Sequence, residues 1–315
     1  MNNVRALGHF KAFAIVTSAL ILLAALGSAL FWARSTSEPE HPVAPRSGPP
    51  AAGNSIEALA GEVDLENRFR YAVTVTPFPS VTGGISKQCS GVVVSPRLVL
   101  SAGHCFCAKR KANHEGAEDA FIIDSSACST RAVVTALVYE RTGRGSGPSF
   151  QAQEYQGTIR VHPGFKVILD KKGSIVSSTQ DLAMLSLETP VDDGLAPVTL
   201  ASTEVEVNEA LIVVGHGYDE TFGTLGGARR SLKTRVTALP SATGGRALLE
   251  RRSEARYRGD SGGPCLRETA QGMELVGILN RSLGHEPSCT STLFYGSWLK
   301  EELKGASATE QPSKQ

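Results

Sequence analysis

The run Gly259-Asp260-Ser261-Gly262-Gly263-Pro264 constrains the fold of this 315-residue chain more than any other segment. Three glycines around one serine predict a tight turn, because glycine adopts backbone conformations that side chains forbid and allows other backbone to approach closely. A serine hydroxyl becomes a nucleophile only when a base takes its proton and donors hold the oxyanion that forms. The run therefore indicates a nucleophile turn at Ser261, with the N–H groups of Gly259 and Ser261 as the candidate oxyanion hole.

The partners that such a serine needs lie upstream in the chain. An apolar run leads into His104, and Asp181 opens a second short apolar run. The looser pattern G-x-S-x-G also fits the nucleophile elbow of α/β-hydrolase esterases, in which the acid and the histidine follow the serine. Only His285 follows Ser261, so the chain order His–Asp–Ser favours a triad of the chymotrypsin type.

The segments SAGHC, DLAML and GDSGGP resemble, in order, the three signature blocks of the trypsin/chymotrypsin family of serine proteases. The resemblance covers roughly residues 58 to 303. It implies an all-β fold of two closed six-stranded Greek-key barrels with the active site between them. A C-terminal helix is predicted separately at Gly296–Lys304, where apolar residues recur on one side.

The resemblance also assigns roles to the candidate residues. His104 is the base and then the acid toward the leaving amine, Asp181 orients the imidazole, and Ser261 forms the acyl-enzyme. Asp260 is the acid that pairs with a newly cut N-terminus. The function implied is a serine endopeptidase acting on proteins or peptides. The alternative is a protease-like binding module that holds a partner without catalysis.

Specificity is predicted from the residues expected around the substrate pocket. Ala255 stands at the floor of the pocket, where a preference for Arg or Lys would need an aspartate. The substrate residue that binds in this pocket is therefore expected to be small or apolar. Arg258 flanks the pocket entrance, and its positive charge makes a preference for acidic substrate residues the second hypothesis. Asn280 stands where the family commonly has a serine that bonds the triad acid, and Ser282, two residues further on, is also expected at the substrate pocket.

Activation departs from the family pattern. The family is activated by a cut before an Ile-Val-Gly-Gly-like segment, which here corresponds to Ala58–Gly61 or to a segment that starts at Ile56. No basic residue precedes either position. We therefore expect either an activating protease of another specificity or a pocket that forms without cleavage.

The six cysteines predict three disulfides in an exported chain. Sequence alone allows 15 pairings of six cysteines. The resemblance implies the pairs Cys89–Cys105 and Cys265–Cys289, and Cys107–Cys128 remains.

The N-terminal segment places the rest of the chain outside the cytoplasm. Residues 12–33 carry no charge, which fits either a cleaved signal peptide or an uncleaved transmembrane anchor within residues 1–34. Residues 35–57 are rich in Pro, Ser and Ala and predict an extended linker. The protease domain is expected at 58–305, with barrels at about 68–192 and about 205–303, and a disordered tail at 306–315.

Composition excludes several partners. The formal net charge of +1 gives no reason to expect nucleic acid, and a membrane is a partner only through an uncleaved N-terminus. No metal-ligand spacing is apparent, so neither a metal nor a cofactor is predicted.

Strands are predicted in β-branched and apolar runs bounded by turn residues. These runs are Tyr71–Thr76, Gly91–Val94, Leu98–Ser101, Arg131–Tyr139, Gly157–Val161, Leu182–Leu187, Ala210–Val214, Leu232–Leu239, Ala247–Leu249, Met273–Leu279 and Ser291–Tyr295. The basic segment Lys109–Lys111 and the insertion between Val167 and Gln180 are interpreted as loops, either solvated or bound to a partner.

Overall fold

The computed structural model describes residues 61–79, 88–112, 120–140, 149–217, 227–251, 260–283 and 286–309. All of them belong to one compact unit, Asn54–Gln315. The predicted leader and linker of residues 1–57 lie outside the described residues. Within the described ranges, no helix combines the length and the apolar character needed to cross a membrane.

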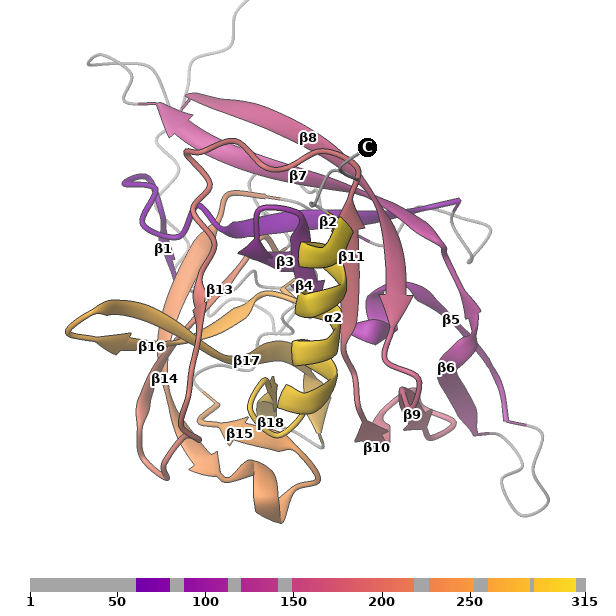
Figure 1. The fold of residues 1–315 in the computed structure, drawn as a ribbon. Coiled ribbons are helices and arrows are strands. Elements are labelled where there is room, and N and C mark those ends of the chain that lie inside the picture. The colour runs from indigo at the N-terminus through magenta and orange to yellow at the C-terminus, as the bar shows by residue number, and fades with distance from the viewer. Residues whose placement is uncertain are drawn as a thin grey trace, which may run out of the picture. The chain divides into compact units, whose positions relative to one another are not determined.

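The first six-stranded barrel closes in the order β11-β4-β3-β2-β7-β8 (Figure 1). Fully buried β-branched residues such as Val73, Val93 and Val99 share one face of its strands. Such residues favour strands because their branched side chains pack well on a pleated surface. The strands are β2 (Ala72–Phe78), β3 (Cys89–Ser95), β4 (Leu98–Ser101), β7 (Arg131–Glu140), β8 (Ser149–Val161) and β11 (Ala183–Leu187).

The second barrel is also closed and six-stranded, because β15 pairs with both β18 and β14. The short strands β1 (Glu62–Val63) and β12 (Thr199–Leu200) extend it, β1 beside β14 and β12 parallel to β17. The predicted fold class is therefore confirmed. The six strands are β13 (Ala210–Gly215), β14 (Arg230–Ala238), β15 (Arg246–Leu249), β16 (Pro264–Thr269), β17 (Gly272–Leu283) and β18 (Glu286–Ser291).

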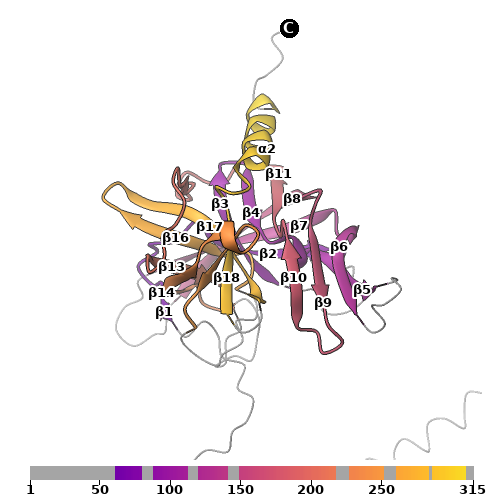
Figure 2. The ribbon, with the colours of Figure 1, turned by 90° about the horizontal axis from the view of Figure 1, so that it is seen from below.

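A separate four-stranded sheet has no counterpart in the sequence predictions (Figure 2). It brings the basic segment Lys109–Lys111 and the insertion 167–180 together, so the interpretation of both as loops is wrong. Ile123 and Val167 lie opposite each other and are buried, which holds the two segments side by side. The order β10-β9-β6-β5 comprises β10 (Ile175–Thr179), β9 (Lys166–Leu169), β6 (Phe121–Cys128) and β5 (Cys107–Lys111).

The chain around Ser291 differs from its prediction as a strand over Ser291–Tyr295. Strand β18 ends at Ser291, whose Oγ accepts a hydrogen bond from the N–H of Phe294 at 3.0 Å. This side-chain bond turns the chain toward the helix instead of extending the strand.

Helix α2 (Gly296–Thr309) runs further than predicted. Residues 306–309, expected in a disordered tail, continue the helix because Ala306 and Ala308 are strong helix formers. Trp298 and Leu299 anchor its first turn in the hydrophobic core.

The three disulfides pair as the resemblance implies: Cys89 with Cys105, Cys107 with Cys128, and Cys265 with Cys289. The first joins β3 to the segment that carries His104. The second closes the β5–β6 hairpin, and the third joins β16 to β18.

A fully buried arginine ties the start of the described chain to both barrels. Arg229 Nε donates to Asp64 Oδ2 at 2.8 Å, and its Nη1 donates to the carbonyl oxygen of Leu137 on β7 at 2.8 Å. The same carboxylate accepts the backbone N–H groups of Arg68 and Phe69. A buried ion pair of this kind is sustained by such additional hydrogen bonds.

Replacing Arg229 with Met leaves the Asp64 carboxylate buried without its cation. We expect the free energy of unfolding, measured by urea denaturation, to fall by about 3–5 kcal/mol. Arg68→Met is the control, because Arg68 forms a 3.6 Å pair with Glu268 in which both side chains are more than half exposed. The control should cost less than about 1 kcal/mol. Equal losses in the two variants would contradict this account of the buried pair.

Candidate active site

His104 is held by both oxygens of one carboxylate. It lies in the short 3₁₀ helix η1 (Gly103–Cys105), directly after β4. Its Nδ1 is 2.8 Å from Asp181 Oδ2, and its backbone N–H donates to Asp181 Oδ1 at 2.8 Å. Because a carboxylate only accepts, Nδ1 carries the ring proton and Nε2 is left as the basic nitrogen.

Asp181 is positioned by a sharp turn before β11. Gln180 has a positive φ of 51°, and its carbonyl oxygen accepts the N–H of Leu182 at 2.8 Å. Burial raises the pKa of Asp181, but the charge and hydrogen bonds of His104, together with the charge of Arg246, outweigh burial and hold this pKa below its ordinary value. The carboxylate is therefore ionised at neutral pH although it is only 2 % exposed.

Ser261 lies against the first barrel. Its carbonyl oxygen accepts the N–H of Ser90 on β3 at 2.8 Å and lies 3.7 Å from the sulfur of Cys105. Since Cys105 follows His104 directly, the structure brings the serine turn next to the segment that carries the histidine. Three distant parts of the chain thus meet at one place.

The glycines after Ser261 allow the turn to fit between the two barrels. Gly262 has a φ of +89°, and a Cβ there would lie 2.1 Å from the carbonyl oxygen of Ser90. A Cβ at Gly263 would lie 2.1 Å from the carbonyl oxygen of Val214 on β13. Side chains at these positions would collide with one barrel each, so only glycine fits at either position.

Asp260 is completely buried beside the end of β13. A Cβ at Gly215 would lie 2.2 Å from Asp260 Oδ1, so the carboxylate packs directly on that glycine. The segment predicted to supply an activating N-terminus, from Ile56 or Ala58, lies outside the described residues.

His216 joins the two barrels. Its N–H donates to Ser90 Oγ at 2.9 Å, and its Nε2 is 3.1 Å from the carbonyl oxygen of Ala72. Burial, with the nearby charge of Arg229, lowers the pKa of His216 to about 4. The ring is therefore neutral where the barrels meet.

The predicted pocket residues are only partly described. Asn280 lies buried on β17, and its Nδ2 contacts Thr290 Oγ1 instead of Asp181. Its Oδ1 has no hydrogen-bond partner among the described residues. Ser282 lies on the same strand, whereas Ala255, Arg258 and Gly259 lie outside the described residues.

Arg246 is a buried residue near the site that the sequence does not predict. It begins β15, is 2 % exposed, and its charge acts on Asp181. An arginine at the start of a short strand is normally solvent-exposed. No pattern in the sequence distinguishes this arginine from an exposed one.

The described residues contain one group with ligand atoms close enough to hold a metal ion: Cys89, His104 and Cys105. The two sulfurs form one disulfide, so they offer no thiolate. The ring nitrogen Nδ1 of His104 is committed to Asp181. These residues therefore do not fit a metal site.

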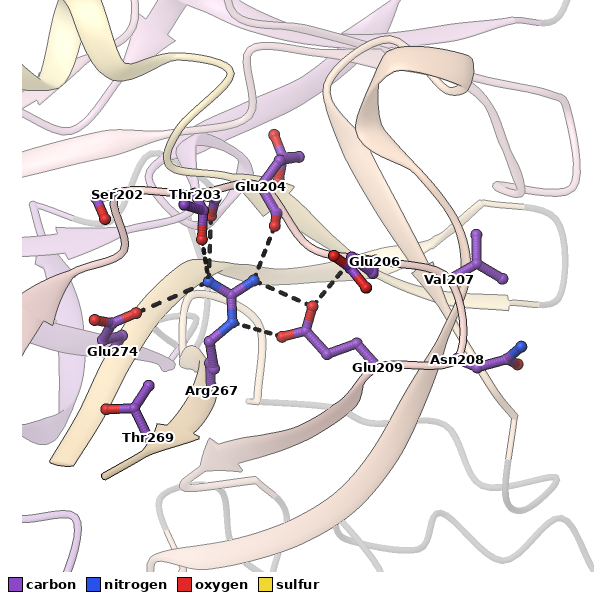
Figure 3. A pocket seen from close by; sticks show the side chains of 10 residues that line it. All are labelled: Ser202, Thr203, Glu204, Glu206, Val207, Asn208, Glu209, Arg267, Thr269 and Glu274. Carbon is purple, nitrogen blue, oxygen red and sulfur yellow. Dashed lines mark hydrogen bonds and ion pairs between the residues drawn. The ribbon is translucent and has the colours of Figure 1, made fainter. Parts of the chain in front are cut away.

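A polar pocket of about 710 Å³ lies on the second barrel, between the chain before β13 and the β16–β17 hairpin (Figure 3). Arg267 fills its centre and donates to both oxygens of Glu209, at 2.6 and 3.1 Å. Further bonds to Thr203 and to the carbonyl oxygen of Glu204 use the rest of its guanidinium. None of the candidate catalytic residues lines this pocket. The hydrogen bonds of Arg267 connect the chain before β13 to the β16–β17 hairpin.

Comparison with known families matches residues 66–297 to the model of the Trypsin family. The match spans most of the chain and includes all three candidate catalytic residues, so this chain belongs to the trypsin family. At the level of the family, it is a serine peptidase with protein or peptide substrates. A comparison with curated proteins found no match.

Replacing Gly262 with Ala tests the fit of the serine turn. The variant combines a positive φ, which costs an L-residue about 1–2 kcal/mol, with a collision against the backbone of Ser90, so we expect a loss of more than about 2 kcal/mol in urea unfolding. Gly173→Ala is the matched control, because Gly173 has a φ of +81° and no atom within 4 Å of the position that a Cβ would take. In the control, the free energy of unfolding should fall only by the cost of the positive φ. A fall in Gly262→Ala that is no larger than in the control would refute the close fit.

The depressed pKa of His216 predicts a pH-dependent stability. An unfolded histidine has a pKa near 6.5, so between pH 6.5 and 4 the unfolded chain binds a proton that the folded protein does not. Stability is fully present above pH 6.5 and falls with pH, and this residue accounts for about 2.5 kcal/mol at pH 4.5 relative to pH 7. In His216→Gln, the difference in unfolding free energy between these two pH values should shrink by about that amount. An unchanged difference would show that His216 is not buried as a neutral ring.

Proposed function

We propose that this chain is a serine endopeptidase that hydrolyses peptide bonds through an acyl-enzyme on Ser261. The observation that carries the proposal is the clamp of Asp181 on His104, with both contacts at 2.8 Å, beside the backbone of Ser261. The clamp fixes the tautomer that a general base needs, because the free Nε2 can take a proton.

The reaction then follows in two halves. Nε2 of His104 takes the hydroxyl proton as Ser261 Oγ attacks the carbonyl carbon of the substrate, and the N–H groups of Gly259 and Ser261 stabilise the oxyanion. His104 gives the proton to the leaving amine, and the acyl group remains on Ser261. Water, deprotonated by the same histidine, attacks the ester and releases the second product.

Asp181 acts throughout by charge and orientation. Its pKa stays below the ordinary value, so it remains ionised in both halves of the reaction. The carboxylate stabilises the imidazolium that forms when His104 takes up the serine proton. It does not itself transfer a proton.

Pocket chemistry supports a preference for small or apolar residues before the cleaved bond, because Ala255 offers no charge to a bound Lys or Arg. A preference for acidic substrate residues, bound through Arg258, is the second hypothesis. Cleavage of a peptide library distinguishes it from the first. Neither Asn280 nor Ser282 adds a formal charge to this pocket.

Activation and location complete the proposal. A cut near Ile56 or Ala58 by another protease would free an amino group for the buried Asp260, and the catalytic domain would begin there and end near residue 305. Three disulfides fit an oxidising compartment outside the cytoplasm. The N-terminal segment of residues 1–34 would direct export, as a cleaved signal or as an anchor.

A protease-like binding module is the second candidate function. One observation favours it: no basic residue precedes the two candidate N-termini, so the usual activating cut is not encoded. In this candidate, the cleft binds a partner and the oxyanion hole is not formed.

Cleavage of a peptide library, read by mass spectrometry, tests the proposal and its specificity. We expect cuts after small or apolar residues, loss of activity in Ser261→Ala and His104→Ala, and a loss of about 10⁴ in kcat for Asp181→Asn. Ser186→Ala is the control, because Ser186 is an exposed serine on β11 and should keep full activity. Dominant cleavage after Lys or Arg would contradict the specificity. Absence of cleavage by protein that starts at Ile56 or Ala58 would favour the binding module.

A further inference from the structure

Gln180, the residue before Asp181, has a backbone conformation that its side chain disfavours. Its φ is 51°, in the left-handed region, where residues other than glycine are uncommon. The other two described non-glycine residues with a positive φ are asparagines, which tolerate this region. A glutamine keeps such a conformation only where the surrounding structure holds it. Because Gln180 leads the chain into Asp181, whatever holds its φ also affects how the carboxylate meets His104.

The carbonyl side of Gln180 is fixed by bonds within the first barrel. Its carbonyl oxygen accepts the N–H of Leu182 at 2.8 Å, and the carbonyl oxygen of Leu182 accepts the N–H of His162 at 3.0 Å. These bonds fix the chain that follows the Cα atom of Gln180. The rotation about its N–Cα bond, which is φ, must be held from the other side.

The side chain of Gln180 lies on Gly164, in the turn between β8 and β9. A Cβ at Gly164 would lie 1.4 Å from Gln180 Oε1. Gly164 is itself held by its N–H, which donates to His162 Nδ1 at 3.1 Å. A long side chain can reach this position by rotating about its own bonds, so this contact places the amide but does not set φ.

The N–H of Gln180 is the group whose direction sets φ, and its partner comes from the end of the second barrel. This N–H donates to Tyr295 Oη at 3.4 Å, across 115 residues of sequence. Tyr295 Oη in turn donates to the carbonyl oxygen of Gly244 at 2.9 Å. A tyrosine hydroxyl has one proton to donate and can accept at its oxygen. The two bonds use it in both roles and therefore orient it.

The ring of Tyr295 is fixed by its neighbours. Gly245 has a φ of +91°, and a Cβ there would lie 2.5 Å from Tyr295 Oη, so the hydroxyl packs directly on the backbone before β15. The rings of His162 and Phe294 meet the Tyr295 ring edge to face, with centroids 5.8 and 5.1 Å away. Tyr295, which lies between β18 and α2, thus supports the residue that precedes the candidate triad acid.

We propose that Tyr295 is a positioning residue for peptide hydrolysis, whose hydroxyl holds Gln180 in the left-handed conformation and so keeps both oxygens of Asp181 on His104. The proposal rests on the proposed function of this pair. Without the hydroxyl, the φ of Gln180 can relax to a negative value, and the carboxylate turns away from one of its two 2.8 Å contacts. His104 Nδ1 then loses its alignment.

Tyr295→Phe tests the proposal, because it keeps the ring and removes only the hydroxyl. We expect kcat to fall about tenfold, the effect of one hydrogen bond, with KM unchanged, since the carboxylate acts when the imidazolium forms. The NMR resonance of the proton between His104 and Asp181 should shift as well. This second readout does not require hydrolysis.

Tyr155→Phe is the matched control. Tyr155 Oη also accepts a backbone N–H, that of Asp192 at 3.2 Å, and this bond does not involve Gln180. The control therefore loses the same kind of hydrogen bond in another part of the first barrel. Both kcat and the resonance should keep their wild-type values.

Gln180→Asn separates an effect on φ from a general effect on the fold. Asparagine adopts the left-handed region more readily, so in this background Tyr295→Phe should lower kcat by less than about threefold. An unshifted resonance with an unchanged kcat in Tyr295→Phe, or an equally large loss in both backgrounds, would overturn the role of Tyr295. A shifted resonance in a protein that cleaves no peptide would instead contradict only the proposed function.

Discussion

The close approach of the backbone at Ser261–Gly263 to strands of both barrels is the constraint on which the rest of the site depends. Ser90 on β3 holds the carbonyl oxygen of Ser261, and Gly263 packs on the carbonyl oxygen of Val214 on β13. The turn therefore has a fixed position only when both barrels are formed and in contact. A nucleophile built in this way is positioned by tertiary structure, and local propensity alone would not place it.

Several polar and charged side chains are buried in the interior of this protein. Asp181, Arg246, His216 and Asp260 are all buried, and the fully buried Arg229 pairs with Asp64 at the start of the described chain. Burying a charge is costly unless other groups compensate it, so these residues must be arranged precisely. The charges of His104 and Arg246 both help to hold the pKa of Asp181 below its ordinary value.

Much of this structure was predictable from the sequence through a family resemblance. The glycines around Ser261 and the apolar runs that lead to His104 and from Asp181 carry that resemblance, which implied the two-barrel fold and the cysteine pairs that the structure contains. The four-stranded sheet was not predictable in the same way. Its strands are short, and they pair across about forty residues of chain, as Ile123 does with Val167. Arg229 and Arg246 were missed because an isolated arginine carries no local signal of burial, which arises only when distant strands enclose it.

The central claim is that Ser261 is a nucleophile activated by His104. It is tested most directly by reacting the exported domain, with its N-terminus sequenced, with a fluorophosphonate and measuring the intact mass. The account predicts one adduct, located on Ser261, that is lost in His104→Ala. A folded protein that starts at Ile56 or Ala58 and remains unlabelled, or an adduct that persists in His104→Ala, would contradict it.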